Sequence, residues 1–268
     1  GTLLNPAERA EAADALDGLG YISEDLYSFV EIPGDDKVST FWIGKYPITN
    51  RQYARFLTPE NFSNPKLWID LPDLDAKGQQ QGTLGEAGWR WLKDEIKDND
   101  LLTPRYWENL RFGHKRSCAP VVGISWYEAM AYARWVQHQW DQLPEAEQNQ
   151  TLKPGLVCLP ADAEWEKAAG GIADDRYAWD RPGETTDREK LTKYANTDES
   201  GIGRSTPVWT YPQGKSHPYG LFDMTGNVWE WGANRYSSES GFRVVRGGSF
   251  LSNHLGARCA FRLRLYPG

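Results

Sequence analysis

The spacing of apolar and polar residues predicts a few helices and short strands, separated by long irregular segments. Over residues 5–19, alanine and leucine recur among charged residues, and Gly18 and Gly20 are the kind of residue that usually ends a helix. Short apolar runs at 29–33 and 40–44 flank a Gly-Asp-Asp turn. Such runs predict a pair of strands.

Two capping-box sequences mark the start of further helices. In such a box, a Ser or Thr side chain binds the backbone three residues on, and the Glu or Gln at that position binds back. Thr49-Asn50-Arg51-Gln52 predicts a helix to about residue 57, and Ser125-Trp126-Tyr127-Glu128 predicts one to about residue 139. Another helix is expected within 159–170, where a run rich in Glu and Ala ends in glycine.

The rest of the chain shows little regular periodicity. Residues 58–118 are rich in Pro, Asp, Gly and Gln, which is typical of long loops with short elements. Short strands are expected at 207–209, 242–245 and 257–260. We therefore expect an α+β fold with two main helices, small β-sheets and much irregular ordered loop.

Composition excludes some classes of function. The chain has 268 residues, with 37 Asp and Glu against 30 Lys and Arg, so its formal net charge is −7. Nucleic-acid binding needs concentrated positive charge, so nucleic acid is not an expected partner. The sequence shows neither an apolar run long enough to span a membrane nor a signal peptide. Three widely spaced cysteines, an odd number, favour a reducing, cytoplasmic setting over a disulfide framework.

An ordered set of motifs resembles the formylglycine-generating-enzyme (sulfatase-modifying factor) superfamily. The segments that carry the resemblance are Ile43–Tyr53, Pro120–Ala129, Leu159–Gly170, Gly220–Trp231 and Arg243–Ser249. The resemblance covers most of the chain from about residue 28 and implies a variant of the C-type-lectin fold. We therefore expect one domain over 28–268, preceded by a helical segment over 1–27 that is a linker or pre-domain.

The catalytic cysteines of this superfamily have no counterpart here. The enzymes place two cysteines soon after the motif Arg246-Gly247-Gly248-Ser249, where thiolates bind copper and activate oxygen, because soft Cu(I) prefers sulfur. Ser252 stands at the first of these positions, and the next cysteine, Cys259, resembles a structural residue of the superfamily. The resemblance therefore implies a non-catalytic protein without copper. We expect Cys118, Cys158 and Cys259 to be small buried side chains.

The C-terminus resembles the variable proteins of diversity-generating retroelements, which share the fold. There, mutagenesis of template adenines, chiefly in AAC codons, cannot produce Lys, Glu, Gln, Met or Trp. None of these five types occurs from Ser249 to Tyr266. The resemblance implies that residues 243–268 present a diversified surface to an unknown protein or other ligand. The candidate variable positions are Phe250, Ser252, Asn253, His254, Leu255, Gly256, Phe261, Leu263, Leu265 and Tyr266.

Three alternatives stay open. Strand alternation could bury Phe261, Leu263 and Leu265 while Arg262 and Arg264 face solvent. The protein could be a copper- and oxygen-dependent oxidase that converts a sulfatase cysteine to formylglycine. It could also be a structural or scaffold module of a larger protein.

The segment 226–231 resembles the calcium loop of the superfamily. There, side-chain oxygens of Asn227 and Glu230 and backbone carbonyls such as that of Val228 would surround a structural Ca²⁺, which takes six to eight oxygen ligands. Alternatively, Asn227 and Glu230 only cap and brace the turn.

A second calcium site of the family would be built from a separate segment. It would use Asn196 and the carbonyls of Thr197 and Ile202. Ser200 stands where an acidic ligand is expected, which weakens this resemblance.

Overall fold

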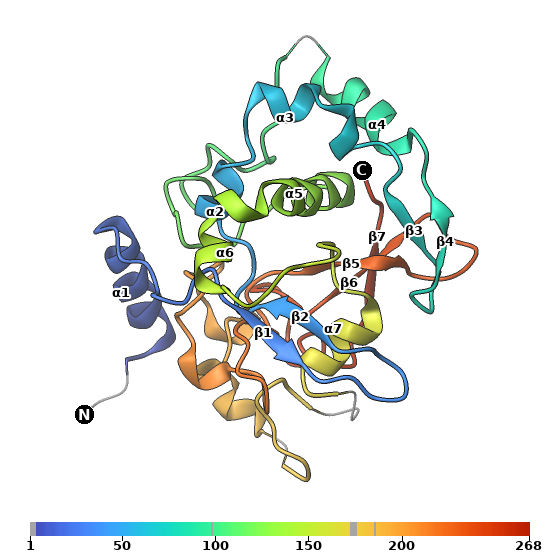
Figure 1. Ribbon diagram of the computed structural model, residues 1–268. Coiled ribbons are helices and arrows are strands. Elements are labelled where there is room, and N and C mark those ends of the chain that lie inside the picture. The colour runs from blue at the N-terminus through green and yellow to red at the C-terminus, as the bar shows by residue number, and fades with distance from the viewer. Residues whose placement is uncertain (1–3, 98, 172–175, 185) are drawn as a thin grey trace.

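Two small β-sheets and a series of short helices surround helix α5 in the computed structural model, which describes residues 4–97, 99–171, 176–184 and 186–268 (Figure 1). The helices are α1 (Pro6–Gly18), α2 (Asn50–Ala54), α3 (Pro59–Ser63), α4 (Ala87–Ile96), α5 (Trp126–Gln139), α6 (Pro144–Gln148) and α7 (Asp162–Ala168). The strands are β1 (Phe29–Ile32), β2 (Phe41–Gly44), β3 (Pro72–Leu74), β4 (Gln80–Thr83), β5 (Glu230–Arg235), β6 (Arg243–Arg246) and β7 (Leu263–Leu265). Short 3₁₀ turns lie at Pro65–Leu67, Trp140–Gln142, Arg188–Lys193, Asp198–Ser200 and Pro212–Gly214. The α+β class is confirmed.

The larger sheet carries the C-terminal segment. Its strand order is β4-β3-β5-β6-β7, and β1 pairs with β2 in a separate antiparallel pair. Strands β5 and β7 both run antiparallel to β6, so Trp231 and Leu263 flank Val245 from either side. Beyond β7 the chain reaches α5, where the N–H of Trp126 donates to the carbonyl of Pro267 (2.9 Å). Figure 1 shows this end of the chain close to α4 and α5.

Side-chain caps explain where the main helices begin. At the start of α1, Asn5 and Glu8 each accept a hydrogen bond from the other's backbone N–H, both at 2.9 Å. Ser125 and Glu128 form the same reciprocal pair at the start of α5, at 2.7 and 3.2 Å. Each pair satisfies backbone donors that the first helical turn leaves free. The helices predicted from these boundaries are confirmed.

Some predicted elements are wrong. The predicted strands at 207–209 and 257–260 are turns, and α2 ends at Ala54 rather than near residue 57. In the second turn, the N–H of Cys259 donates to the carbonyl of Arg176 (3.0 Å). Its backbone is thus satisfied by a distant loop instead of a neighbouring strand, which an apolar run alone does not reveal.

Helix α1 is attached to the rest of the chain by charged and polar contacts. Asp14 forms ion pairs with Arg116 and with Arg204, the latter at 2.7 Å. Asp17 accepts hydrogen bonds from the Ser117 hydroxyl (2.7 Å) and the Cys118 N–H (3.1 Å). Figure 1 shows α1 at one side of the molecule, beside the loops that it contacts.

Indole rings fill much of the core, and the fully buried ones donate hydrogen bonds through their N–H groups. Trp68, Trp126 and Trp165 are among the largest fully buried side chains. Their indole N–H groups donate to the carbonyls of Asn61 and Gly232 and to the carboxylate of Glu230, each at 3.0 Å. The bonds of Trp126 and Trp165 connect elements that are far apart in sequence, so these indoles also fix the segments around them.

Arg246, at the end of β6, joins α7 to the C-terminal segment. Its side chain is 1% exposed. The guanidinium donates to Asp162 (2.5 Å) and Glu166 (2.9 Å) of α7 and to the carbonyl of Cys259 (2.9 Å). It also lies over the Trp165 ring, 5.5 Å from the centroid. Only a planar fork of several N–H donors can make all these contacts at once.

We expect Arg246→Lys to destabilise the fold by about 2 kcal/mol, because an ammonium cannot reach both carboxylates and the carbonyl, and a broken buried ion pair is costly. The measurement is the free energy of unfolding in urea. Arg264→Lys is the matched control, because Arg264 is exposed on the neighbouring strand, and it should change stability by less than about 0.5 kcal/mol. Equal effects of the two substitutions would contradict this role of Arg246.

Candidate functional site

The two glycines after Arg246 turn the chain sharply into the candidate surface. Gly247 and Gly248 have φ angles of +88° and +76°, which favour glycine. A Cβ atom on Gly248 would lie 2.9 Å from the carbonyl oxygen of Gly256. The Arg-Gly-Gly sequence therefore has a structural reason: it lets the loop at 249–257 fold back against the end of β6.

Two candidate positions, Ser252 and Asn253, stabilise the shape of this loop. The Ser252 hydroxyl accepts a hydrogen bond from the N–H of Ser249 (3.0 Å). The side-chain oxygen of Asn253 accepts from the N–H groups of Leu255 (3.1 Å) and Gly256 (3.2 Å). Short polar side chains that bind nearby backbone donors stabilise tight turns. Ser252 and Asn253 thus contribute to the loop's own structure as well as to its surface.

His254 faces an acidic partner outside the segment. Its N–H donates to the Glu199 carboxylate at 2.7 Å, and its Nδ1 lies 3.2 Å from the same oxygen. The Tyr177 hydroxyl donates to the His254 carbonyl at 3.1 Å. Burial alone would raise the pKa of Glu199, but hydrogen bonds from the Thr197 hydroxyl and from His254 outweigh it and lower the pKa. His254 is therefore held at the base of the loop.

Most of the large apolar side chains of the segment are exposed. Leu255, Phe261, Leu265 and Tyr266 are 47, 39, 41 and 68% exposed, and Leu251, which the sequence analysis left out, is 70% exposed. We call these five residues the C-terminal surface. Isolated exposed apolar side chains are ordinary, but several along one short segment are typical of an interaction site.

The alternative that strand alternation buries this segment does not hold. Phe261 and Leu265 are exposed, and only Leu263 is half-buried. Arg262, expected to face solvent, forms an ion pair with Asp162 at 2.9 Å. The β7 strand is short and lies at the sheet edge, so its alternation does not create a buried face.

Aromatic residues from other segments flank the candidate positions. Phe250 stacks on Phe112, with ring centroids 5.6 Å apart. Phe261 lies against Trp229 (5.9 Å), and the Tyr266 ring meets Phe242 edge to face (6.0 Å). The contact between the Phe112 loop and the C-terminal segment spans well over a hundred residues, so neither spacing nor motif could have identified it.

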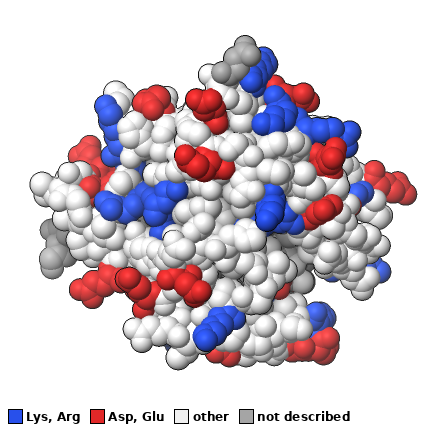
Figure 2. Space-filling model, turned by 45° about the horizontal axis from the view of Figure 1, so that its top comes forward, with Lys and Arg blue, Asp and Glu red and all other residues white. Residues whose placement is uncertain are grey.

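Charged side chains of both signs are interspersed on the face of the molecule in Figure 2, with wide uncharged areas between them. On this face, the described residues form no concentrated basic area of the kind that binds phosphates. Among the described residues, no helix is long and apolar enough to cross a membrane.

The cysteines differ in their surroundings. Cys118 and Cys259 are buried, as expected. Cys158 is not buried, so that prediction is wrong: its side chain faces a cavity that the extended segment 152–160 lines. The apolar residues next to Cys158 in the sequence do not indicate that its side chain faces a cavity.

Hydrogen bonds already occupy the side chain of Asn227 in the calcium-loop motif. Its oxygen accepts from the N–H of Thr206 (2.8 Å), and its nitrogen donates to the Asp223 carboxylate (2.7 Å). These bonds match the bracing role that was the alternative for Asn227. The Glu230 carboxylate accepts from the Trp165 indole at 3.0 Å.

The Asp223 carboxylate, which the sequence analysis missed, is buried, and the Glu230 carboxylate is half-buried. Burial raises the pKa of Asp223 well above its usual range, and the nearby Glu230 charge raises it further. Burial also raises the pKa of Glu230 to about 7. A hard cation beside the two carboxylates would offset this cost, so the donor set fits Ca²⁺. Calcium binding here, with the carbonyl of Val228, stays a prediction.

The second expected calcium segment lies next to the first. The Asn196 side chain donates to the Asn227 side chain at 3.2 Å. The Ser200 hydroxyl lies within hydrogen-bond distance of the Asn196 side chain (2.9 Å) and the Thr197 carbonyl (2.7 Å). Ile202 packs against Ala10 of α1. The described residues contain no group of three or more His, Cys, Asp or Glu that could hold a metal, so backbone carbonyls would have to complete either site.

The fold and the Arg-Gly-Gly-Ser turn define a domain of the formylglycine-generating-enzyme type. The profile of the family described as Sulfatase-modifying factor enzyme 1-like domain (FGE-sulfatase) matches residues 30–268. The chain therefore belongs to this family.

The relatives differ in length and in the activity for which they are named. A formylglycine-generating enzyme of Streptomyces coelicolor is 29% identical over 250 residues, covering 80% of this chain and 69% of the enzyme. The serine/threonine-protein kinase pkn1 of Chlamydia caviae is 28% identical over 249 residues, covering 85% of this chain and 31% of the kinase. This chain thus spans less than a third of that kinase. The structure of PvdO from Pseudomonas aeruginosa has a similar fold, with a TM-score of 0.50 and 18% identity, covering 90% of this chain and 85% of PvdO.

Proposed function

We propose that this protein is a non-catalytic ligand-binding member of its family, and that the C-terminal surface is its binding site. The observation that carries the proposal is the exposure of five apolar side chains on a segment whose backbone is held in place by hydrogen bonds. These residues are Leu251, Leu255, Phe261, Leu265 and Tyr266. Binding sites need apolar anchors that reach a partner, on a scaffold that does not lose much entropy when the partner arrives.

The scaffold restricts the backbone of the segment without involving the exposed side chains. Arg246 binds the carbonyl of Cys259, and Asn253 binds the loop's own N–H groups. Neither contact uses the side chain of Leu255, Phe261 or Tyr266. These positions can therefore change identity while the backbone stays in place, which is the property that a diversified surface requires. Aromatic rings at such positions supply contact area at low conformational cost.

The alternative, a copper- and oxygen-dependent oxidase, needs two thiolates near the Ser249 turn. Ser252 supplies a hydroxyl, which is bonded to the N–H of Ser249, and Cys259 is buried behind the turn. Burial raises the pKa of the Cys259 thiol to about 12, which disfavours the thiolate that copper requires.

We expect no conversion of cysteine to formylglycine when the protein is incubated with a cysteine-containing sulfatase peptide, Cu(I) and oxygen. The measurement is the intact mass of the peptide over time. The Streptomyces coelicolor formylglycine-generating enzyme, assayed in parallel, should convert the same peptide. Turnover by this chain above the level with copper alone would overturn the non-catalytic assignment.

We expect the gene to have a diversification template. The genome should contain an adenine-rich, nearly identical copy of the segment that encodes 243–268, beside a reverse transcriptase gene. The differences should concentrate at codons for exposed positions such as Leu255 and Tyr266, and spare those for Arg246, Gly247 and Gly248. Sequencing of the surrounding DNA is the measurement, and a genome without such a copy would refute diversification.

A further inference from the structure

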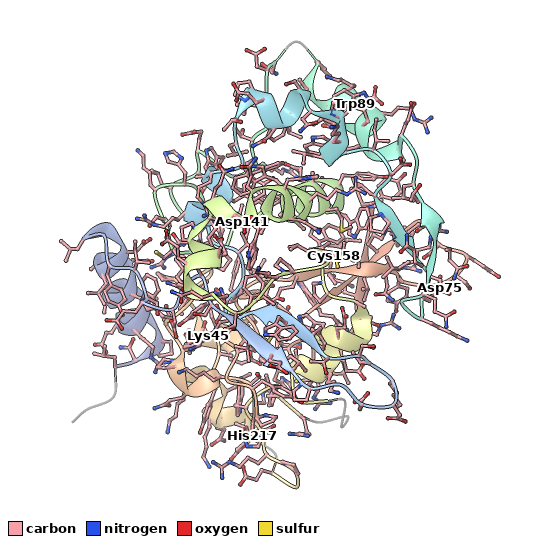
Figure 3. The ribbon with its side chains drawn as sticks, in the orientation of Figure 1. Lys45, Asp75, Trp89, Asp141, Cys158 and His217 are labelled. Carbon is pink, nitrogen blue, oxygen red and sulfur yellow. The ribbon has the colours of Figure 1, made fainter. Side chains whose placement is uncertain are left out.

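A cavity of about 1260 Å³ lies under the β1–β2 pair. Its walls come from β2, from one face of α5 and from the extended segment 152–160, and it reaches Phe250 at the C-terminal segment. Figure 3 shows Cys158 among these elements, inside the outline of the ribbon. The volume suits an organic ligand of moderate size.

The lining of the cavity is mainly apolar because of the way α5 is turned. Ala129, Ala133 and Val136 line the cavity at helical spacing, so the side of α5 that faces it carries mostly small side chains. Residues Phe41–Gly44 of β2 also line the cavity. A well-packed core would place larger side chains here. The small residues leave room that the chain itself does not fill.

One end of the cavity carries an acidic group with spare acceptor capacity. One carboxylate oxygen of Glu164, on α7, accepts a hydrogen bond from the N–H of Ala161 (2.7 Å). No group of the described residues donates to its other oxygen. Burial raises the pKa of Glu164. Burial, with a smaller contribution from the Glu164 charge, also raises the pKa of the Cys158 thiol to about 11.

None of the other charged groups of the lining, among the described residues, forms an ion pair with Glu164. Glu145 is already paired with Arg55 at 3.0 Å. Arg111 donates to the carbonyl of Gly203 (2.8 Å). Lys153 is exposed. Glu230 adds a second carboxylate to the lining. The lining thus combines apolar walls with a carboxylate, Glu164, that forms no ion pair with another described residue.

We propose that this cavity binds an organic amine with a long apolar body, and that the ammonium group lies beside the Glu164 carboxylate. The apolar walls remove the body from water, which stabilises the complex by about 25 cal/mol per Å². The ammonium supplies the donors and the positive charge that the half-buried Glu164 carboxylate lacks. Indole rings of Trp42, Trp229 and Trp231 also line the cavity, and such rings attract cations.

The charged end of the cavity is on α7, away from the C-terminal surface, although Leu251 and Leu265 of that surface also line the cavity. A substitution at Glu164 therefore tests amine binding without changing any residue of the C-terminal surface. Conversely, amine binding in the cavity does not depend on whether the gene has a diversification template.

Cys158 gives a direct experiment because it is the cysteine that faces the cavity, whereas Cys118 and Cys259 are buried. The neutral reagent N-phenylmaleimide should modify Cys158, and peptide mass spectrometry gives the rate. Decylamine, decan-1-ol and decanoate are compared as protecting ligands, each below its micellar concentration. We expect decylamine to slow the modification roughly tenfold more than decan-1-ol at equal concentration, corresponding to about 1.4 kcal/mol. Decanoate should protect less than either.

The variant Glu164→Gln removes the negative charge of the side chain but keeps its size, so it tests the charge separately from the cavity volume. The amide oxygen of Gln can still accept from the Ala161 N–H, so α7 should still form, which circular dichroism checks. Decylamine should then protect Cys158 no better than decan-1-ol. Glu95→Gln, at an exposed position of α4, is the matched control and should keep the preference for the amine.

A third variant, Ala133→Leu, narrows the cavity from the α5 side and should weaken protection by both decylamine and decan-1-ol. Three results would overturn the proposal. They are equal protection by amine and alcohol in the native chain, an amine preference that survives in Glu164→Gln, and stronger protection by decanoate than by decylamine.

Discussion

The contact on which the C-terminal half depends is the buried guanidinium of Arg246. It binds two carboxylates of α7 and a carbonyl of the C-terminal segment from one planar group. Removal of this group would leave Glu166 without its ion-pair partner and Asp162 with Arg262 alone, and breaking an ion pair in which one group is buried is costly. The two glycines that follow can then turn the chain, because their backbone angles carry no Cβ penalty. The Arg-Gly-Gly-Ser motif is therefore a structural junction in this protein, whatever chemistry relatives place beyond it.

This motif separates the residues that must stay constant to keep the backbone in place from the exposed positions that can vary. Main-chain carbonyls and short polar side chains hold the loop, and the large apolar side chains point away from these bonds. Ser252 illustrates the change from the enzymes that the sequence resembles. Its hydroxyl stabilises the turn through the Ser249 N–H, where a catalytic thiolate would be needed for copper. In such a surface, new side chains can add binding contacts while the backbone that carries them stays unchanged.

The sequence predicted local structure well where one interaction decided it. The capping boxes at Thr49 and Ser125 located the starts of two helices because a cap depends on residues three apart. The turn at 257–260 was missed because a distant loop satisfies its backbone. Helix α4 was missed because its segment is rich in loop-forming residues. The resemblance located the C-terminal surface, but not Leu251 or Phe112, and the cavity at Cys158 depends on how α5 is turned in three dimensions.

The most direct measurement of the central claim is a saturation substitution of residues 243–268, with resistance to proteolysis as the readout of folding. The account predicts that Arg246, Gly247 and Gly248 tolerate almost no substitution. Leu255, Phe261 and Tyr266 should accept most residues, polar ones included, with changes within about 0.5 kcal/mol. Equal tolerance at both sets of positions, or loss of folding when the exposed residues change, would contradict a fixed frame that carries a free binding surface.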